Sequence, residues 1–195
     1  HFYRVAMRAL KLFDSELDSS SKSEKETEES RCIVVVAGLL HDIVSVPKDS
    51  PDRSKASYLS GEKAEEILLT YNFTKELIPR VKHAITAHSF SASIQPETIE
   101  AKCVQDSDRI DALSTLGILR CLYVGRLTNR IPYDPDDILA ERRPLDDTKN
   151  SFDHFSVKIY KLPDLLQTQK DKEMSVRLIE VIKELVQEPI YQIGS

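Results

Sequence analysis

The chain of 195 residues is long enough for one large domain, or for one domain with an appendage. Hydrophobic residues make up 41% of it and charged residues 30%, which excludes a globally disordered or a collagen-like chain. The longest apolar run has nine residues, Cys32 to Leu40, and is too short to span a membrane. The net charge of −5 disfavours a stable complex with nucleic acid, because the negatively charged phosphate backbone binds to positively charged protein surfaces. A small anionic substrate is still possible, since a pocket can be positively charged in a chain whose net charge is negative.

The cysteines indicate a reducing compartment. Cys32, Cys103 and Cys121 are odd in number and have no C-x-x-C spacing, so we expect reduced, mostly buried thiols in a cytoplasmic protein. We expect no signal peptide within this sequence, and we expect that a chain beginning at His1 rather than Met is missing its start, together with any targeting segment.

The first 44 residues fall into a predicted helix, a predicted loop and a segment that fits either a strand or a helix. Residues 2–17 place apolar side chains at helical spacing. Residues 18–30 contain no apolar side chain and are predicted to form a mobile acidic surface loop. Residues 31–44 are apolar on every side: β-branched residues favour a strand over 33–36, but a buried helix fits the periodicity equally well.

Three helical patterns follow. Amphipathic helices are predicted over residues 60–71 and 74–88. The longest periodic stretch, residues 98–127, is apolar over much of its circumference and predicts a long buried central helix.

The last third of the chain begins with a predicted loop-rich segment, residues 129–147, which contains three prolines and many charges. Two C-terminal helices are predicted within 148–188, over residues 150–166 and 171–188. Helical patterns dominate, and 5 glycines are few for the hairpin turns of a β-protein. The sequence therefore predicts a single all-α domain over 1–195.

Two groups of polar residues could carry chemistry. His41 and Asp42 end the most apolar segment, where a charge must be paired or bind a metal, although a single His-Asp dipeptide is weak evidence. Asp106, Asp108 and Asp111 bring three carboxylates into one predicted helix, where they repel one another unless a cation lies between them. The alternative is a solvated helix face with a neighbouring arginine as counter-ion.

With His1-x-x-Arg4-Val5, these groups give the order His, His-Asp, Asp, which resembles the HD superfamily of metal-dependent phosphohydrolases. Further motifs resemble its YedJ/YpgQ-like branch: Gly-Leu-Leu-His-Asp-Ile, Ala-His-Ser-Phe, Val-Gln-Asp-Ser-Asp-Arg-Ile-Asp-Ala-Leu, Ile-Pro-Tyr-Asp-Pro and Arg-Pro-Leu-Asp-Asp. The chain departs from this branch in two ways: the usual sequence before the first ligand histidine is absent, and residues 18–30 resemble an insertion.

The resemblance implies an HD-type helical bundle, in which the segment before His-Asp is a helix. It implies His1, His41, Asp42 and Asp108 as ligands of one divalent metal. Two imidazoles and two carboxylates suit Mn²⁺, Fe²⁺, Co²⁺, Ni²⁺ or Zn²⁺. Phosphate chemistry and the family's habit favour Mn²⁺ or Mg²⁺, with Mn²⁺ as first choice.

Other residues are assigned supporting roles. His88 is predicted to act as an acid or a phosphate contact, whereas His83 is more typical of a surface histidine, and the two could hold a second metal only if both faced inward. Supporting positions around the ligands are assigned to Arg4, Asp106 and Asp111.

A phosphorylated substrate needs positive charge. Arg109, next to Asp108, is the most constrained candidate, and Arg53, Lys55 and Arg130 are further candidates that are also typical of surface charges. Tyr133 could cover a base or sugar.

The resemblance therefore implies a hydrolase of phosphoanhydride or phosphoester bonds, with a (d)NTP pyrophosphohydrolase as the first hypothesis. A 5′-nucleotidase or a cyclic-nucleotide phosphodiesterase is the alternative within this class. A non-catalytic HD module that binds a nucleotide or a partner, and a helical adaptor without a metal, are the hypotheses of other classes. The sequence does not determine the oligomeric state.

Overall fold

The computed structural model describes residues 1–17, 23–46 and 50–193, and only the backbone of Arg53 and of residues 189–193. It contains eight α-helices and no strand among these residues, so the predicted all-α class is confirmed. The chain divides into two compact units, His1–Asp108 and Arg109–Ser195, where the sequence suggested one domain; α5 (Ile99–Leu113) runs through the boundary.

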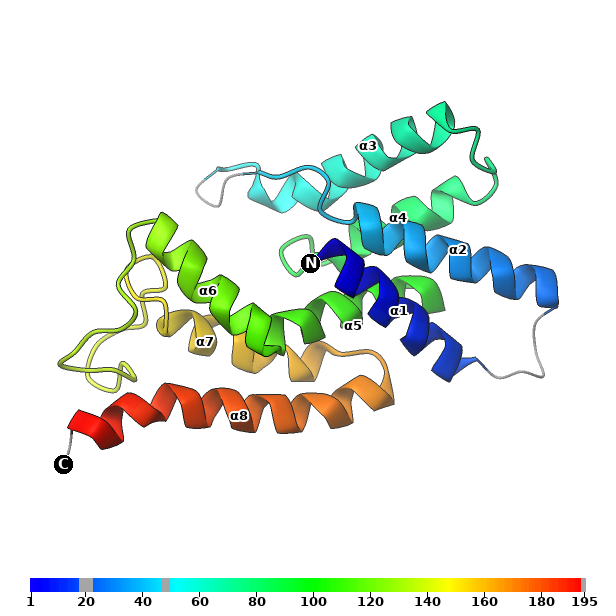
Figure 1. Ribbon diagram of the computed structural model, residues 1–195. Coiled ribbons are helices and arrows are strands. Elements are labelled where there is room, and N and C mark those ends of the chain that lie inside the picture. The colour runs from blue at the N-terminus through cyan, green and yellow to red at the C-terminus, as the bar shows by residue number, and fades with distance from the viewer. Residues whose placement is uncertain (18–22, 47–49, 194–195) are drawn as a thin grey trace. The chain divides into compact units, whose positions relative to one another are not determined.

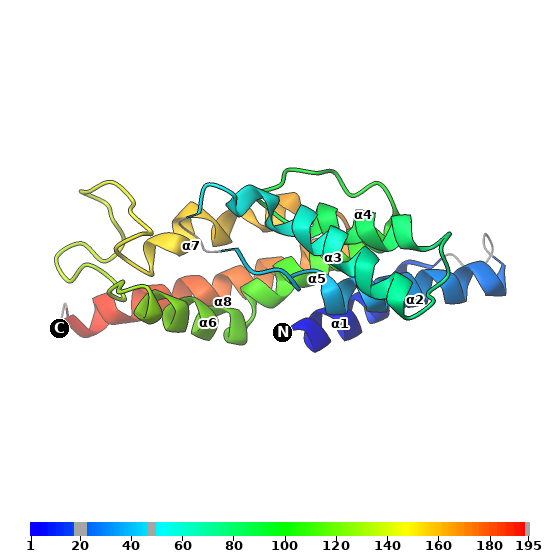
Figure 2. The same cartoon turned by 90° about the horizontal axis from the view of Figure 1, so that it is seen from above.

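The first unit is built from two pairs of helices and the first part of α5. Figures 1 and 2 show α1 (Phe2–Glu16) beside α2 (Glu24–Leu40), and α3 (Ala56–Thr70) beside α4 (Ile78–His88). A short 3-10 helix, η1 (Arg53–Lys55), precedes α3. Buried side chains from all five helices form one hydrophobic core, which includes Phe13, Ile33, Ile85 and Val104.

Helices α1 and α2 approach each other closely at a glycine. A Cβ atom added to Gly38 would lie 2.6 Å from the Cα atom of Ala6, so only a residue without a side chain fits at this crossing. Because His1 precedes α1 and His41 follows α2, this crossing brings the two histidine-bearing ends together.

The prediction of a mobile loop over residues 18–30 is wrong for 24–30, which form the first turns of α2. Ser23 caps this helix: its side chain accepts from the backbone N–H of Glu26, and the Glu26 side chain accepts from the backbone N–H of Ser23. This capping box, together with packing on α1, outweighs a composition without apolar residues. Residues 18–22 lie outside the described residues. In contrast, the helical interpretation of 31–44 is confirmed up to Leu40.

The prediction of one continuous helix over 98–127 is wrong, because the helix is interrupted at Ser114. Ser114 ends α5 and caps α6 (Thr115–Leu127), since its hydroxyl accepts from the Gly117 backbone N–H at 3.2 Å. The second half is also less buried than predicted: Gly117, Ile118 and Gly125 of α6 are buried, whereas Leu119, Tyr123 and Leu127 are exposed.

The second unit continues with short elements and one long helix. The helix predicted over 150–166 is instead α7 (Asp153–Val157) followed by two 3-10 turns, η2 (Ile159–Lys161) and η3 (Pro163–Leu165). Pro163, the first residue of η3, lacks the N–H that a continuous helix requires, which explains the break between η2 and η3. The chain then enters α8 (Gln169–Ile193), and a second core gathers around Phe155, Leu162 and Ile182.

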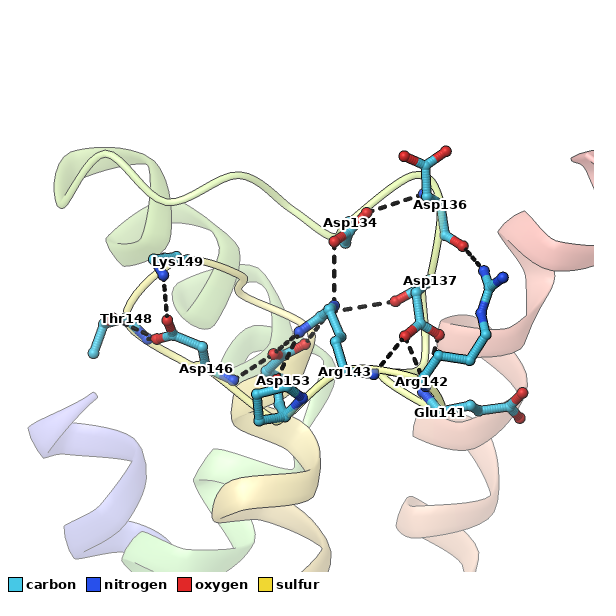
Figure 3. Close-up of polar contacts among 11 residues, drawn as sticks. Asp134, Asp136, Asp137, Glu141, Arg142, Arg143, Asp146, Thr148, Lys149 and Asp153 are labelled. Carbon is cyan, nitrogen blue, oxygen red and sulfur yellow. Dashed lines mark hydrogen bonds and ion pairs between the residues drawn. The ribbon is translucent and has the colours of Figure 1, made fainter.

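The segment between α6 and α7 has no helix and only one bridge, between Ile131 and Asn150. An arginine organises it, as Figure 3 shows. The Arg143 guanidinium donates to both carboxylate oxygens of Asp153, at 2.6 and 2.8 Å, and lies 3.2 Å from Asp134. The Asp137 carboxylate accepts from three consecutive backbone N–H groups, those of residues 141–143.

Candidate metal centre

Five polar side chains of the first unit gather where four helices meet. His1 is the N-cap of α1, His41 is the C-cap of α2, Asp42 follows it, His88 ends α4, and Asp108 lies within α5. Their donor atoms form two groups that share His41, and within each group all atoms lie within 4.8 Å of one another.

The first group is His1, His41 and Asp108. The Nε2 atoms of the two histidines are 3.2 Å apart, and the Asp108 carboxylate lies 3.3 Å from His1 and 3.8 Å from His41. The second group is His41, Asp42 and His88, in which Asp42 lies 3.9 Å from His41 and 3.4 Å from His88.

Backbone carbonyls fix the orientation of two imidazole rings. Nδ1 of His41 donates to the carbonyl oxygen of Gly38 at 2.8 Å, and Nδ1 of His88 donates to that of Ile85 at 2.5 Å. Since a carbonyl oxygen can only accept, the neutral ring of His41 presents the lone pair of Nε2 to the other side chains of its group, whereas His88 needs a second proton, at Nε2, to donate to Asp42. The arrangement of His41 is the one in which protein histidines bind metals.

Burial and charge set the protonation of these groups. Burial lowers the pKa of His41, which favours the neutral ring that a metal requires. Burial opposes ionisation of Asp108, but the hydrogen bond to His1 and the neighbouring histidines hold the pKa of this carboxyl well below its usual range. Burial also opposes protonation of His88, yet the hydrogen bond to Asp42 and the charge of Asp108 raise the pKa of His88.

A divalent cation fits this donor set. The lone pair of His41 Nε2 faces the Nε2 atom of His1 and two carboxylates at 3.2–3.9 Å. These electron-rich groups repel one another unless a cation lies between them. Three imidazoles and two carboxylates form a nitrogen and oxygen set that suits Mn²⁺, Fe²⁺, Co²⁺, Ni²⁺ or Zn²⁺. His41 is fully buried, whereas the Asp42 side chain is 46% exposed, so the set is reached from the side of Asp42.

The structure places the four predicted ligands in two groups that share His41, and it places His88 beside Asp42 in the second group. The sequence assigned His88 a different role, and its Ala-His-Ser-Phe context was the available signal; that its ring meets Asp42 depends on the packing of α4 against α2. His83 is in neither group. Its Nε2 atom accepts a hydrogen bond from the backbone N–H of Glu97 at 3.0 Å. His83 and His88 therefore do not face each other as a pair that could hold a second metal.

The other predicted residues of the first unit are more scattered. Arg4 is exposed, Asp106 is fully buried, and exposed Lys55 makes an ion pair with Asp52 at 2.7 Å. The side chain of Arg53 lies outside the described residues.

The remaining predicted residues belong to the second unit. Arg109 is buried and donates to the carbonyl oxygen of Leu165, a partner that the sequence did not indicate. Asp111 is buried and lies 4.0 Å from Arg120. Arg130 is half-buried, and the half-buried Tyr133 ring packs against Phe152 with 5.2 Å between ring centroids.

The all-helical fold and the histidine-aspartate cluster define a helical protein with a candidate divalent-metal site. The family model of the HD domain matches residues 1–113, which contain the whole cluster. The chain belongs to the HD-domain family.

One protein of Bacillus subtilis is similar in both sequence and structure. The uncharacterized protein YpgQ of Bacillus subtilis is 30% identical over 147 residues, which cover 73% of this chain and 63% of that protein, less than two thirds of its length. The crystal structure of Bacillus subtilis YpgQ matches with a TM-score of 0.70 and 27% identity, covering 99% of this chain and 87% of that one.

Two further solved structures are informative. The crystal structure of YpgQ in complex with ADP matches with a TM-score of 0.70 and 26% identity, covering 98% of this chain and 84% of that one. An HD-superfamily hydrolase from Bacillus thuringiensis matches with a TM-score of 0.59 and 26% identity over 96% of this chain and 86% of that one. No helix in the described part of this chain is both long and apolar enough to cross a membrane.

Proposed function

We propose that this protein is a metal-dependent phosphohydrolase that acts on nucleotides, and specifically that it cleaves a (d)NTP to the monophosphate and pyrophosphate. The observation that supports this proposal most is the gathering of three imidazoles and two carboxylates from four helices. Membership of the HD-domain family and the ADP complex of YpgQ support a nucleotide as substrate.

His1, His41, Asp42 and Asp108 would hold one divalent cation, with Mn²⁺ as the favoured ion. A divalent metal supplies Lewis acidity toward a phosphoryl oxygen and lowers the pKa of bound water from 15.7 toward about 7. Asp108 stays ionised at neutral pH because its pKa is held well below its usual range. The neutral ring of His41 keeps its Nε2 lone pair because Gly38 holds the proton at Nδ1.

His88 acts as the acid in this proposal. The hydrogen bond to Asp42 and the charge of Asp108 raise its pKa, so it holds a proton at Nε2 up to a higher pH than burial alone would allow. From that position it can donate to a phosphate oxygen or to the leaving group. Lys55, Arg53, Arg109, Arg130 and Tyr133 remain the proposed contacts to phosphates and base, and we place the protein in the cytoplasm on its cysteine usage.

The test is turnover by untagged protein with Mn²⁺ and a panel of nucleoside triphosphates, with products separated and identified. We expect pyrophosphate and the monophosphate, and no turnover by Asp108→Ala above background. Orthophosphate from a monophosphate would indicate a 5′-nucleotidase, and opening of a cyclic nucleotide would indicate a phosphodiesterase. Nucleotide binding that survives chelation without any chemistry would contradict the proposal and favour a binding module.

A further inference from the structure

A second buried polar cluster lies in the first unit, away from the candidate metal centre. It consists of Ser30 on α2, Arg80 on α4 and Glu100 on α5. Ser30 is fully buried and Glu100 is 2% exposed. The Ser30 hydroxyl donates to Glu100 Oε1 at 2.7 Å, and the Arg80 guanidinium donates to the same oxygen and, at 3.1 Å, to Ser30.

These three residues lie on the same three helices that present His41, His88 and Asp108. Each precedes its metal-site residue by two to three helical turns, which is about 12–16 Å along the helix axis. Because the helices touch at both places, they run side by side in the same direction from this cluster to the metal centre.

Between the two places many of the side chains are small and most of the contacts are apolar; one buried hydrogen bond, from the Gln105 side-chain amide to the Ala87 carbonyl oxygen at 2.6 Å, also joins α5 to α4. Ala37 lies on α2, Ala84 and Ala87 on α4, and Ala101 on α5, all fully buried. Apolar contacts of this kind tolerate small displacements along an axis, whereas a hydrogen-bonded charge does not. Displacing α2 would remove Ser30 from the buried Glu100 carboxylate, and displacing α4 would remove Arg80; either loss has a high cost in free energy.

We propose that Glu100 is a positioning residue that fixes α2, α4 and α5 along their axes and thereby sets the spacing of the metal-binding side chains at their far ends. This inference rests on the metal site of the proposed function. A carboxylate in the first turn of a helix can also serve stability alone, through the helix dipole, so the test must separate spacing from stability.

The experiment is a titration of the folded metal-free protein with Co²⁺, whose visible absorption reports ligand geometry. We expect Glu100→Ala to weaken Co²⁺ binding about tenfold or more and to change the absorption spectrum. Glu100→Gln, which keeps an acceptor for Ser30, is expected to fall between Glu100→Ala and the unmodified protein. Leu68→Ala, in the same core but on α3, is the control: it lowers stability and leaves affinity and spectrum unchanged.

The outcomes are distinct. If Glu100→Ala is folded, by circular dichroism, and has unchanged affinity and spectrum, the inference is overturned while the proposed function stands. If Leu68→Ala changes the spectrum as much, the effect is one of stability and the inference is likewise overturned. If Glu100→Ala does not fold, Glu100→Gln and Ser30→Ala are compared in the same way. Absence of Co²⁺ binding by the unmodified protein would instead remove the metal site and the proposed function together.

Discussion

The position of one proton on His41 determines what the candidate site can bind. The Gly38 carbonyl holds that proton at Nδ1, so Nε2 must face His1 and the carboxylates with a lone pair. The sequence supplied the identities of His1, His41, Asp42 and Asp108, but not this orientation, because it depends on a local turn at the end of α2. Nor could it show that His88 meets Asp42, since that contact is made only by packing.

The role of His88 is testable at this scale. Replacing His88 by Ala removes the proposed acid but leaves the four proposed ligands, so we expect metal content to be retained and turnover to fall by about 10²–10⁴-fold. Metal analysis and initial rates on the same preparation measure both. Loss of the metal together with activity would show that His88 is a ligand and that the assignment as acid is wrong. His83→Ala is the matched control, since that ring contacts the Glu97 backbone, and it should leave both quantities unchanged.

A second residue-scale prediction concerns the crossing of α1 and α2. In Gly38→Ala the new methyl group meets the α1 backbone at Ala6, so we expect a loss of about 1–3 kcal/mol in the free energy of unfolding, and weaker metal binding as His1 moves from His41. Gly61→Ala is the control, because its new methyl group meets mainly the side chains of Thr86 and Lys82, which can move. Urea unfolding and metal titration measure the difference, and equal behaviour of the two variants would refute the importance of this crossing.

At the scale of elements, periodicity predicted where helices occur but not where they stop. The apolar pattern of residues 2–17 gives α1 directly, whereas the pattern over 98–127 passes through Ser114 without interruption. The break depends on a serine cap, which periodicity does not detect. The same applies to residues 24–30, where composition indicated a loop and the capping box at Ser23 extends the helix.

The loop segment before α7 depends on the ion pair of Arg143 and Asp153 (Figure 3). Burial opposes ionisation of Asp153, but hydrogen bonds from Arg143 and from the Asp146 backbone lower its pKa. A pKa that is lower in the folded than in the unfolded state gives stability that is present above about pH 4 and lost as the pH falls toward the folded value.

We therefore expect Asp153→Asn to lower the free energy of unfolding by about 3 kcal/mol at pH 7, because Arg143 loses its main partner. The difference from the unmodified protein should shrink as the pH falls below about 4. Urea unfolding at pH 7, 5 and 3 measures it, with Asp164→Asn, at an exposed carboxylate of the same unit, as the control. A difference independent of pH would refute the role of this carboxylate charge.

For the whole molecule, the family could be predicted from the order of a few motifs, because a metal site of this kind requires those residue types at particular positions on several helices. Composition gave the helical class, but it did not give the two compact units, whose boundary lies inside α5. The sequence also could not predict which individual cysteines are buried: Cys103 is buried and Cys121 half-buried as expected, whereas Cys32 is exposed. Each depends on which face of a helix the tertiary packing covers.

The account depends most on a metal ion held by His1, His41, Asp42 and Asp108. Elemental analysis of protein purified without a histidine tag and incubated with Mn²⁺ before desalting measures it directly. The predicted result is about one Mn²⁺ per chain in the unmodified protein, and none above background in Asp108→Ala that circular dichroism shows to be folded. Equal metal content in the two proteins, or none in either, would contradict the account.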